Sequence, residues 1–481
     1  MLKNIASFVF AGISLLTGNS LFVCQAEDPV KTPRPIPATR PEMKELLENM
    51  KVRGHRIPLP ELTDEQKKEA GSRATSYEAQ LRAAYVPAEE GSVFGAGRPR
   101  NAQSGAPSGG NNAPRPDFTR NADENMTLSY QFKTMLFWIV SRTNNCQYCL
   151  GHQEWKLSAT GMNDDAIAAL DSDWSAYSEK EQAAFAYARL LTYEPHRLSD
   201  SELEKVLKHY TPAQVLEMTM SVSGNNSINR WKEGTGIPQS SGNTFAGRGG
   251  ASSAEHSDSF ETPTSEKFTT AVSVVAPFEV RGGKPSGNGV SNRPTTEARD
   301  EVLAKLDEAK SRSSRLPLID AEKTVAWITE SGFESPSQNW LRLIANFPNE
   351  GRGRLPALLS RERRTGLLTE LQKAQINWIT ARQDRAWYAV GQAMKKLRSL
   401  GQSEDEIFAL DGDWSGFSQG DRALFQLARH LAASPIALTD GDVEVALKST
   451  SPGHVVQTVN HVAGCAYFNR VTEAAGLPIE D

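Results

Sequence analysis

Cysteine and histidine are scarce in this chain, and the shortage of cysteine narrows what the protein can be. Only 4 of the 481 residues are cysteine and 8 are histidine, so this is not a small domain held by many disulfides. The formal net charge is only −5 and no basic stripe occurs, which argues against nucleic acid as a partner. After the N-terminus, no apolar run approaches the roughly 20 residues of a membrane-spanning helix.

The length and the many glycines and prolines indicate several domains rather than one. A chain of 481 residues has room for two or three hydrophobic cores, and its 36 glycines and 26 prolines favour flexible connections between them. Residues 91–116 are rich in Gly, Asn, Ser and Pro and are predicted to be a disordered insertion. Residues 239–295 are predicted to be a flexible linker.

The first 26 residues have the pattern of a secretory signal peptide. Lys3 supplies the positive charge, residues 5–16 are apolar, and small side chains precede a cleavage site after Ala26. The alternatives are an uncleaved membrane anchor and a lipoprotein acylated on Cys24. Acylation is disfavoured because Val23, just before Cys24, is too large for a good acylation signal. The sequence therefore predicts an exported protein, periplasmic or extracellular.

A repeat of the chain upon itself is the strongest structural signal. Residues 142–238 align without a gap to residues 382–478 at a constant offset of 240, and about a third of the positions are identical. Both copies have helical patterns. Ser178 and Glu181 form a capping box before an apolar helix, and Thr211 and Pro212 have the pattern of another helix start. These patterns predict an all-α protein.

The first copy contains a C-x-x-C-x-x-H motif formed by Cys146, Cys149 and His152. Asn144 and Asn145 precede it, and asparagine is a good N-cap, so a helix is predicted to begin at Cys146. Residues three apart share a helix face, and the N-terminal dipole lowers the pKa of a thiol there. The spacing also permits a disulfide, and the pattern predicts a redox pair.

Two other interpretations of this motif remain open. Export favours oxidation, so the cysteine pair can be a static structural disulfide. Cys146, Cys149 and His152 can instead ligate zinc, although no fourth ligand is near in sequence. Cys465, in the second copy, is predicted to be a buried free thiol.

The motif and its surroundings resemble the carboxymuconolactone decarboxylase / AhpD-like alkylhydroperoxidase family. The residues that carry the resemblance are the helix ending at Arg142, the C-x-Y-C with a nearby histidine, and the later pair Asn229 and Arg230. It covers both copies, most clearly residues 130–238 and 340–478. The resemblance implies an all-α fold, thiol-dependent peroxidase (peroxiredoxin-type) activity, no bound cofactor or metal, and association of domains.

The resemblance also implies roles for individual residues. In the family the second cysteine attacks the peroxide and the first resolves it, which assigns attack to Cys149 and resolution to Cys146. The family glutamate and histidine of the proton relay map to Thr134 and Gln153, so that relay is not intact. His152 is the candidate replacement base, although adjacent helix positions point about 100° apart.

The second copy has lost the reactive groups but keeps its packing residues. Ala386, Ala389 and Gln392 stand at the positions of the two thiols and the histidine. This copy is expected to complete a dimer-like interface within the chain, or to support a homo-oligomer. The predicted organisation is two AhpD-like helical domains in tandem: signal peptide 1–26, helical extension 27–90, insertion 91–116, thiol domain 117–238, linker 239–295 and silent domain 296–481.

The expected function is therefore that of an exported thiol peroxidase or disulfide oxidoreductase. Its partners are a small-molecule peroxide and a thiol reductant that the sequence does not identify. A non-enzymatic assembly or binding protein with a structural disulfide is the first alternative. A lactone decarboxylase-like enzyme, which would not need the thiols, is the second.

Overall fold

The computed structural model describes residues 40–61, 76–90, 121–171, 174–243 and 296–480, with Pro37, 63–65 and 67. Within these residues the protein is all helical and has no strands, which confirms the predicted fold class. The predicted signal peptide, the insertion 91–116 and nearly all of the linker 239–295 lie outside the described residues. No helix in the described part is both long and apolar enough to cross a membrane.

Six helices of the first repeat return in the same order in the second, each beginning 240 residues later. Those of the first repeat are α4 (Tyr130–Thr143), α5 (Gln147–Ala159), α6 (Asp164–Ala169), α7 (Glu179–Tyr193), α8 (Asp200–Leu207) and α9 (Pro212–Thr235). Those of the second are α14 (Glu370–Asp384), α15 (Trp387–Ser399), α16 (Glu404–Ala409), α17 (Gln419–Ala432), α18 (Asp440–Ser449) and α19 (Pro452–Ala474).

Local capping signals explain where several of these helices begin. Ser178 and Glu181 form the predicted capping box at the start of α7. Thr211 caps α9 with Pro212 in its first turn, as predicted. At the other end of α9, Gly236 takes a left-handed conformation (φ 69°), which ends the helix without steric cost.

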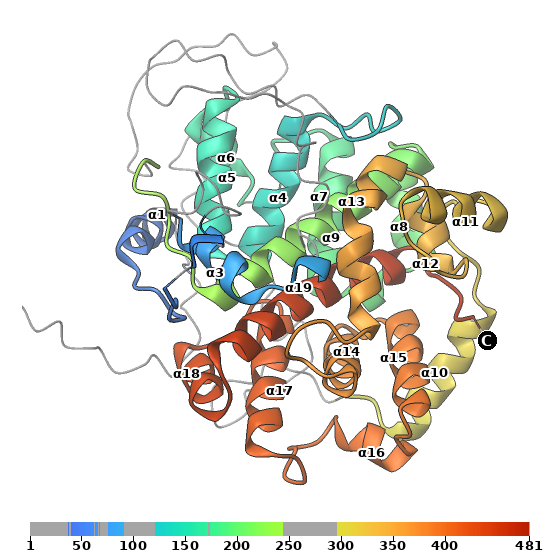
Figure 1. Ribbon diagram of the computed structural model, residues 1–481. Coiled ribbons are helices and arrows are strands. Elements are labelled where there is room, and N and C mark those ends of the chain that lie inside the picture. Colours follow the sequence, from blue (N-terminus) through green and yellow to red (C-terminus); the bar gives the residue numbers. More distant parts are fainter. Residues whose placement is uncertain are drawn as a thin grey trace, which may run out of the picture.

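The remaining helices flank the two repeats. Before the first repeat lie α1 (Arg40–Asn49), the short 3-10 helix η1 (Met50–Val52), α3 (Tyr77–Tyr85) and η3 (Ala88–Glu90). Before the second lie α10 (Arg299–Ser311), α11 (Ala321–Glu330), α12 (Asn339–Ile344), α13 (Pro348–Leu359) and η7 (Ser360–Glu362). Helix α1 packs on α5, and α3 packs on α19 (Figure 1).

The long helices α9 and α19 form the centre of the molecule and make the largest helix–helix contact (Figure 1). A Cβ on Gly234 would lie 2.5 Å from Val459 Cγ1, so glycine is needed for this close approach. Buried side chains of both repeats belong to one continuous hydrophobic cluster. The two repeats therefore share a core in the structure.

Two arginines make reciprocal hydrogen bonds between the repeats. Arg230 Nη2 on α9 donates to the Ala432 carbonyl of the second repeat at 3.2 Å. Its counterpart, Arg470 on α19, donates from Nη2 to the Thr192 carbonyl of the first repeat at 2.8 Å. Thr192 and Ala432 are themselves counterparts at the offset of 240. Each repeat therefore holds the end of the other's α7 or α17 helix in the same way.

Candidate functional site: the Cys146–Cys149 pair

The turn that joins α4 to α5 positions the two thiols. The sequence predicts an asparagine N-cap, but in the structure Cys146 is the N-cap residue, and α5 begins one residue later than expected, at Gln147. Asn145 has a left-handed backbone (φ 55°), which asparagine tolerates better than most residues. The side-chain amide of Asn144 instead donates to Asn226 and Asn229 on α9, at 2.9 Å each. Tertiary hydrogen bonds thus replace the predicted local cap.

The second repeat completes the same turn. Ser434 Oγ donates to Asn144 Oδ1 at 2.7 Å, and the Ile436 amide donates to the Asn144 carbonyl at 3.0 Å. Arg230 Nη2 donates in turn to Ser434 Oγ at 2.7 Å. Side-chain and backbone atoms of Asn144 are therefore bonded to the second repeat just before the first thiol.

Both thiols are free and buried, Cys146 at 0% and Cys149 at 1% exposure. Burial raises the pKa of Cys146 well above its usual range, and a hydrogen bond with Cys149, with the charges of Cys149 and Glu233, raises it further. Our expectation that the helix N-terminus lowers the thiol pKa is therefore wrong for Cys146, because burial outweighs the dipole. Cys146 keeps its proton at neutral pH and lies against Cys149.

Two lysines act on the charge of Cys149. Burial lowers the pKa of Lys156, two turns along α5, while the negative charge of Cys149 acts to raise it. Burial also acts to lower the pKa of Lys232, but pairing with Glu78 and the charges of Tyr148 and Cys149 raise it overall. Lys232 Nζ lies 4.4 Å from the centroid of the Tyr148 ring and is hydrogen bonded to Glu78. The charge of Cys149 thus acts on the pKa of both lysines, which places two cations within electrostatic reach of this sulfur.

His152 lies on α5 between two aromatic rings. Its ring centroid is 6.2 Å from that of Tyr148 and 5.9 Å from that of Trp155. Burial lowers its pKa to about 4, and the charges of Lys156 and Lys232 lower it too. The imidazole is therefore neutral at pH 7 and is available as a hydrogen-bond acceptor, but its low pKa makes it a weak base. Its assignment as the base of the reaction stays a prediction.

The two positions that correspond to the family proton relay have local structural contacts. Thr134 Oγ1 donates to the Tyr130 carbonyl in its own helix at 2.8 Å. Gln153 Nε2 donates to the Cys149 carbonyl at 3.3 Å, while its buried Oε1 has no partner in the described part of the chain. Neither group titrates near neutral pH, so neither transfers protons as the family residues do.

The corresponding region of the second repeat is closed by a carboxylate. Ala386 and Ala389 are buried where the thiols would be. Glu480 accepts hydrogen bonds of 3.0 Å from both the Tyr388 hydroxyl and Gln392 Nε2. Ala386 and Ala389 cannot carry out thiol chemistry. Glu480 binds Tyr388 and Gln392, which are the counterparts of Tyr148 and His152.

A zinc site at the motif was one of the open interpretations. Across the residues that the structure describes, no group of three or more His, Cys, Asp or Glu side chains is arranged to hold a metal ion. The zinc interpretation therefore lacks a ligand set within those residues.

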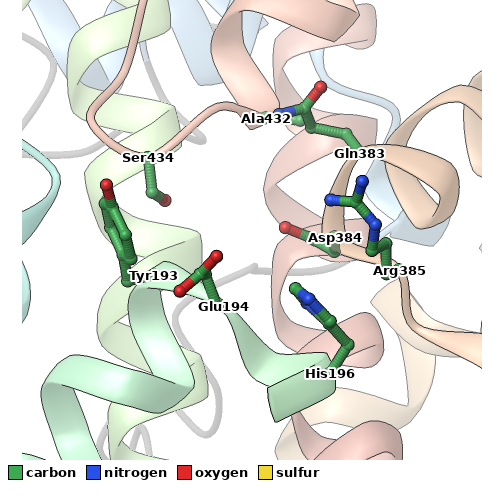
Figure 2. A pocket seen from close by; sticks show the side chains of 8 residues that line it. All are labelled: Tyr193, Glu194, His196, Gln383, Asp384, Arg385, Ala432 and Ser434. Carbon is green, nitrogen blue, oxygen red and sulfur yellow. The ribbon is translucent and has the colours of Figure 1, made fainter. Parts of the chain in front are cut away.

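A polar recess lies at a different place, where η4 (Pro195–Arg197) and the end of α7 meet the end of α14 (Figure 2). Its lining residues are Tyr193, Glu194, His196, Gln383, Asp384, Arg385, Ala432 and Ser434. Arg470 donates to Asp384 at 3.1 Å, and Arg385 is hydrogen bonded to Glu297. Its strongest charges are thus paired within the protein, and neither thiol lines it.

The sequence motif did not identify the charged residues around the thiols. Lys156 is two helical turns beyond Cys149 and so shares its face, a signal that the spacing offered. Lys232 comes from α9 and Glu78 from the N-terminal extension, and only tertiary packing brings them to Cys149. The repeat offered one sign that Lys232 belongs with the thiols. The second repeat, which lacks the thiol pair, has Thr472 at the position of this lysine.

No protein-family model matches this chain, and a search of curated proteins finds no significant match.

Proposed function

We propose that this protein is an exported, thiol-dependent peroxidase or disulfide oxidoreductase of the AhpD-like type. The observation that carries the proposal is a pair of buried, hydrogen-bonded thiols at the start of α5, of which Cys149 but not Cys146 interacts electrostatically with Lys156 and Lys232. This is the asymmetry that a resolving and an attacking cysteine require. The peroxide is a small molecule, and an external thiol or dithiol closes the cycle.

The proposed reaction consumes one peroxide for each disulfide formed. The Cys149 thiolate attacks the distal oxygen of a hydroperoxide; an S–O bond forms, the O–O bond breaks, and the leaving alkoxide takes up a proton as the alcohol. Cys146 sulfur then attacks the Cys149 sulfenic acid, and water leaves as the S–S bond forms. An external thiol reductant returns the disulfide to two thiols and is itself oxidised to a disulfide.

We further propose that the two repeats are two AhpD-like domains forming a dimer-like pair within one chain. The reciprocal contacts of Arg230 and Arg470 and the central packing of α9 on α19 support this arrangement. The second repeat has no thiol at the positions of Cys146 and Cys149, and its part is to hold the turn before Cys146 through Ser434 and Ile436.

A static structural disulfide is the second candidate, because both thiols are buried and buried thiols are poorly reactive. The reduction potential of the pair distinguishes the two functions. A structural bond has a potential below about −300 mV, whereas a catalytic pair is reduced more easily.

Thiol titration of the mature protein before and after peroxide tests the proposal directly. We expect cumene hydroperoxide or hydrogen peroxide to remove two thiols for each peroxide consumed, and Cys149→Ser to abolish this loss. Cys465→Ala is the matched control, because its thiol is buried elsewhere and should leave the reaction unchanged. Peroxide consumption that persists at the same rate in Cys149→Ser would overturn the assignment.

A further inference from the structure

Lys156 is a cation beside the thiol pair. The carboxylate that pairs with its counterpart in the second repeat has no equivalent in the first repeat. In the second repeat its counterpart, Lys396, forms an ion pair of 3.0 Å with Glu370 at the start of α14. In the first repeat Tyr130 stands at the position of that glutamate, and its ring centroid lies 5.8 Å from Lys156 Nζ. Among the described residues no carboxylate lies within ion-pair distance of Lys156.

A second carboxylate of the silent repeat is also missing around the thiols. Glu480 binds Tyr388 and Gln392 in the second repeat, and its counterpart in the first is Ser240. Glu370 and Glu480, which bind side chains at this position of the second repeat, thus have no acidic counterpart beside Cys146 and Cys149. An unpaired, part-buried ammonium is costly, and a bound anion compensates that cost.

The surface beside Lys156 is aromatic. Trp155 is 41% exposed, and the part-buried rings of His152 and Tyr148 follow along the same face of α5. The second repeat has the cation Lys395 at this position, whereas the first repeat has the large apolar ring of Trp155. Such a surface suits a molecule with an apolar body, because exposed apolar area is stabilised when it is covered.

We propose that Lys156 and the aromatic face of α5 recognise a carboxylate on an organic co-substrate that has an apolar body and reacts at Cys149. This inference rests on the proposed function. The carboxylate can belong to the hydroperoxide, which oxidises the pair, or to the thiol, which reduces it. The chemistry of recognition is the same for both, a carboxylate paired with an otherwise unpaired ammonium group.

The test compares an acid with its own methyl ester. The oxidative arm uses cumene hydroperoxide bearing a para-carboxylate and the methyl ester of the same compound; the reductive arm uses 3-mercaptopropionate and its methyl ester. Each pair shares its reacting atom, so the acid-to-ester rate ratio cancels any effect of Lys156 on the thiolate itself. We expect a ratio of roughly fivefold or more in one arm, falling with added salt.

Two variants should abolish this preference. Lys156→Met removes the cation, and Tyr130→Glu supplies the counter-ion that the second repeat has. Both variants should lower the acid-to-ester rate ratio to about the value that the unmodified protein shows at high salt. Lys396→Met is the matched control, because Lys396 is already neutralised by Glu370 and should leave the ratio unchanged. Circular dichroism shows whether each variant is folded.

The outcomes separate this inference from the proposed function. If neutral hydroperoxides oxidise the pair but neither arm prefers the acid, or if the preference survives in Lys156→Met, the recognition role is wrong while the peroxidase proposal stands. If no peroxide oxidises the pair and the disulfide does not exchange with any thiol, the proposed function itself fails.

Discussion

Ser434 Oγ donates a 2.7 Å hydrogen bond to Asn144 Oδ1 across 290 residues of sequence. This contact joins the second repeat, which lacks the thiol pair, to the turn that precedes Cys146. Both side chains are buried, so the amide oxygen of Asn144 depends on Ser434 for its hydrogen bond. The turn before the thiol pair is therefore supported by a residue of the second repeat that lies far from it in sequence.

Ser434→Ala tests how much the turn depends on the second repeat. The change leaves Asn144 Oδ1 and one nitrogen of Arg230 without this partner, so we expect a loss of about 1–3 kcal/mol in the free energy of unfolding. Urea unfolding measures it. Ser399→Ala, at an exposed helix end, is the control and should change stability by less than about 0.5 kcal/mol. Equal effects from the two variants would contradict the role given to Ser434.

The cation Lys232 is expected to make Cys149 more reactive. Glu78→Gln leaves this cation in place, whereas Glu78→Gln with Lys232→Met removes the charged pair without leaving a lone carboxylate. We expect the double variant to react with iodoacetamide at Cys149 roughly fivefold to tenfold more slowly at pH 7 than Glu78→Gln, because the thiolate loses a neighbouring positive charge.

Peptide mass mapping measures this alkylation rate at Cys149. Lys205→Met is the control, since Lys205 is an exposed lysine paired only with Glu202 in its own helix. A double variant that reacts as fast as Glu78→Gln would show that Lys232 does not stabilise the thiolate.

His152 should make the folded protein less stable in mild acid. Its pKa is lowered to about 4 by burial and by the two lysines, whereas an unfolded histidine titrates near 6.5. The unfolded state thus binds more protons between these values, and stability falls as pH falls from about 6.5 to 4. We expect His152→Asn to reduce the stability difference between pH 7 and pH 5 by on the order of 1–2 kcal/mol. A pH dependence unchanged by this variant would contradict the lowered pKa.

Cys465 should be unreactive in the folded protein. It is fully buried, and burial raises the pKa of its thiol. We expect iodoacetamide to label it at least about tenfold more slowly in the native protein than in guanidinium chloride. Rapid native labelling would instead mean that α19 opens readily. The sequence predicted this residue as a buried free thiol, and the structure confirms that.

The sequence by itself determined the helical fold, the repeat and the C-x-x-C-x-x-H motif, because these can be read from the sequence without the structure. Helix caps at Ser178 and Thr211 need only nearby residues, and the offset of 240 is visible without any structure. The tertiary structure decided what surrounds the thiols. Cys146 rather than asparagine caps α5 because α9 and Ser434 bind the Asn144 side chain, and burial reverses the expected pKa shift at Cys146.

The charges around Cys149 are a second property that only folding decides. Lys232 on α9 and Glu78 on α3 lie far from the motif in sequence, and electrostatic effects depend on distance in space and on burial rather than on spacing along the chain. The same holds for Lys156. Its position on the thiol face follows from helical spacing, but its surroundings depend on the fold. Among the described residues Lys156 lies near the Tyr130 ring, whereas Lys396 forms an ion pair with Glu370.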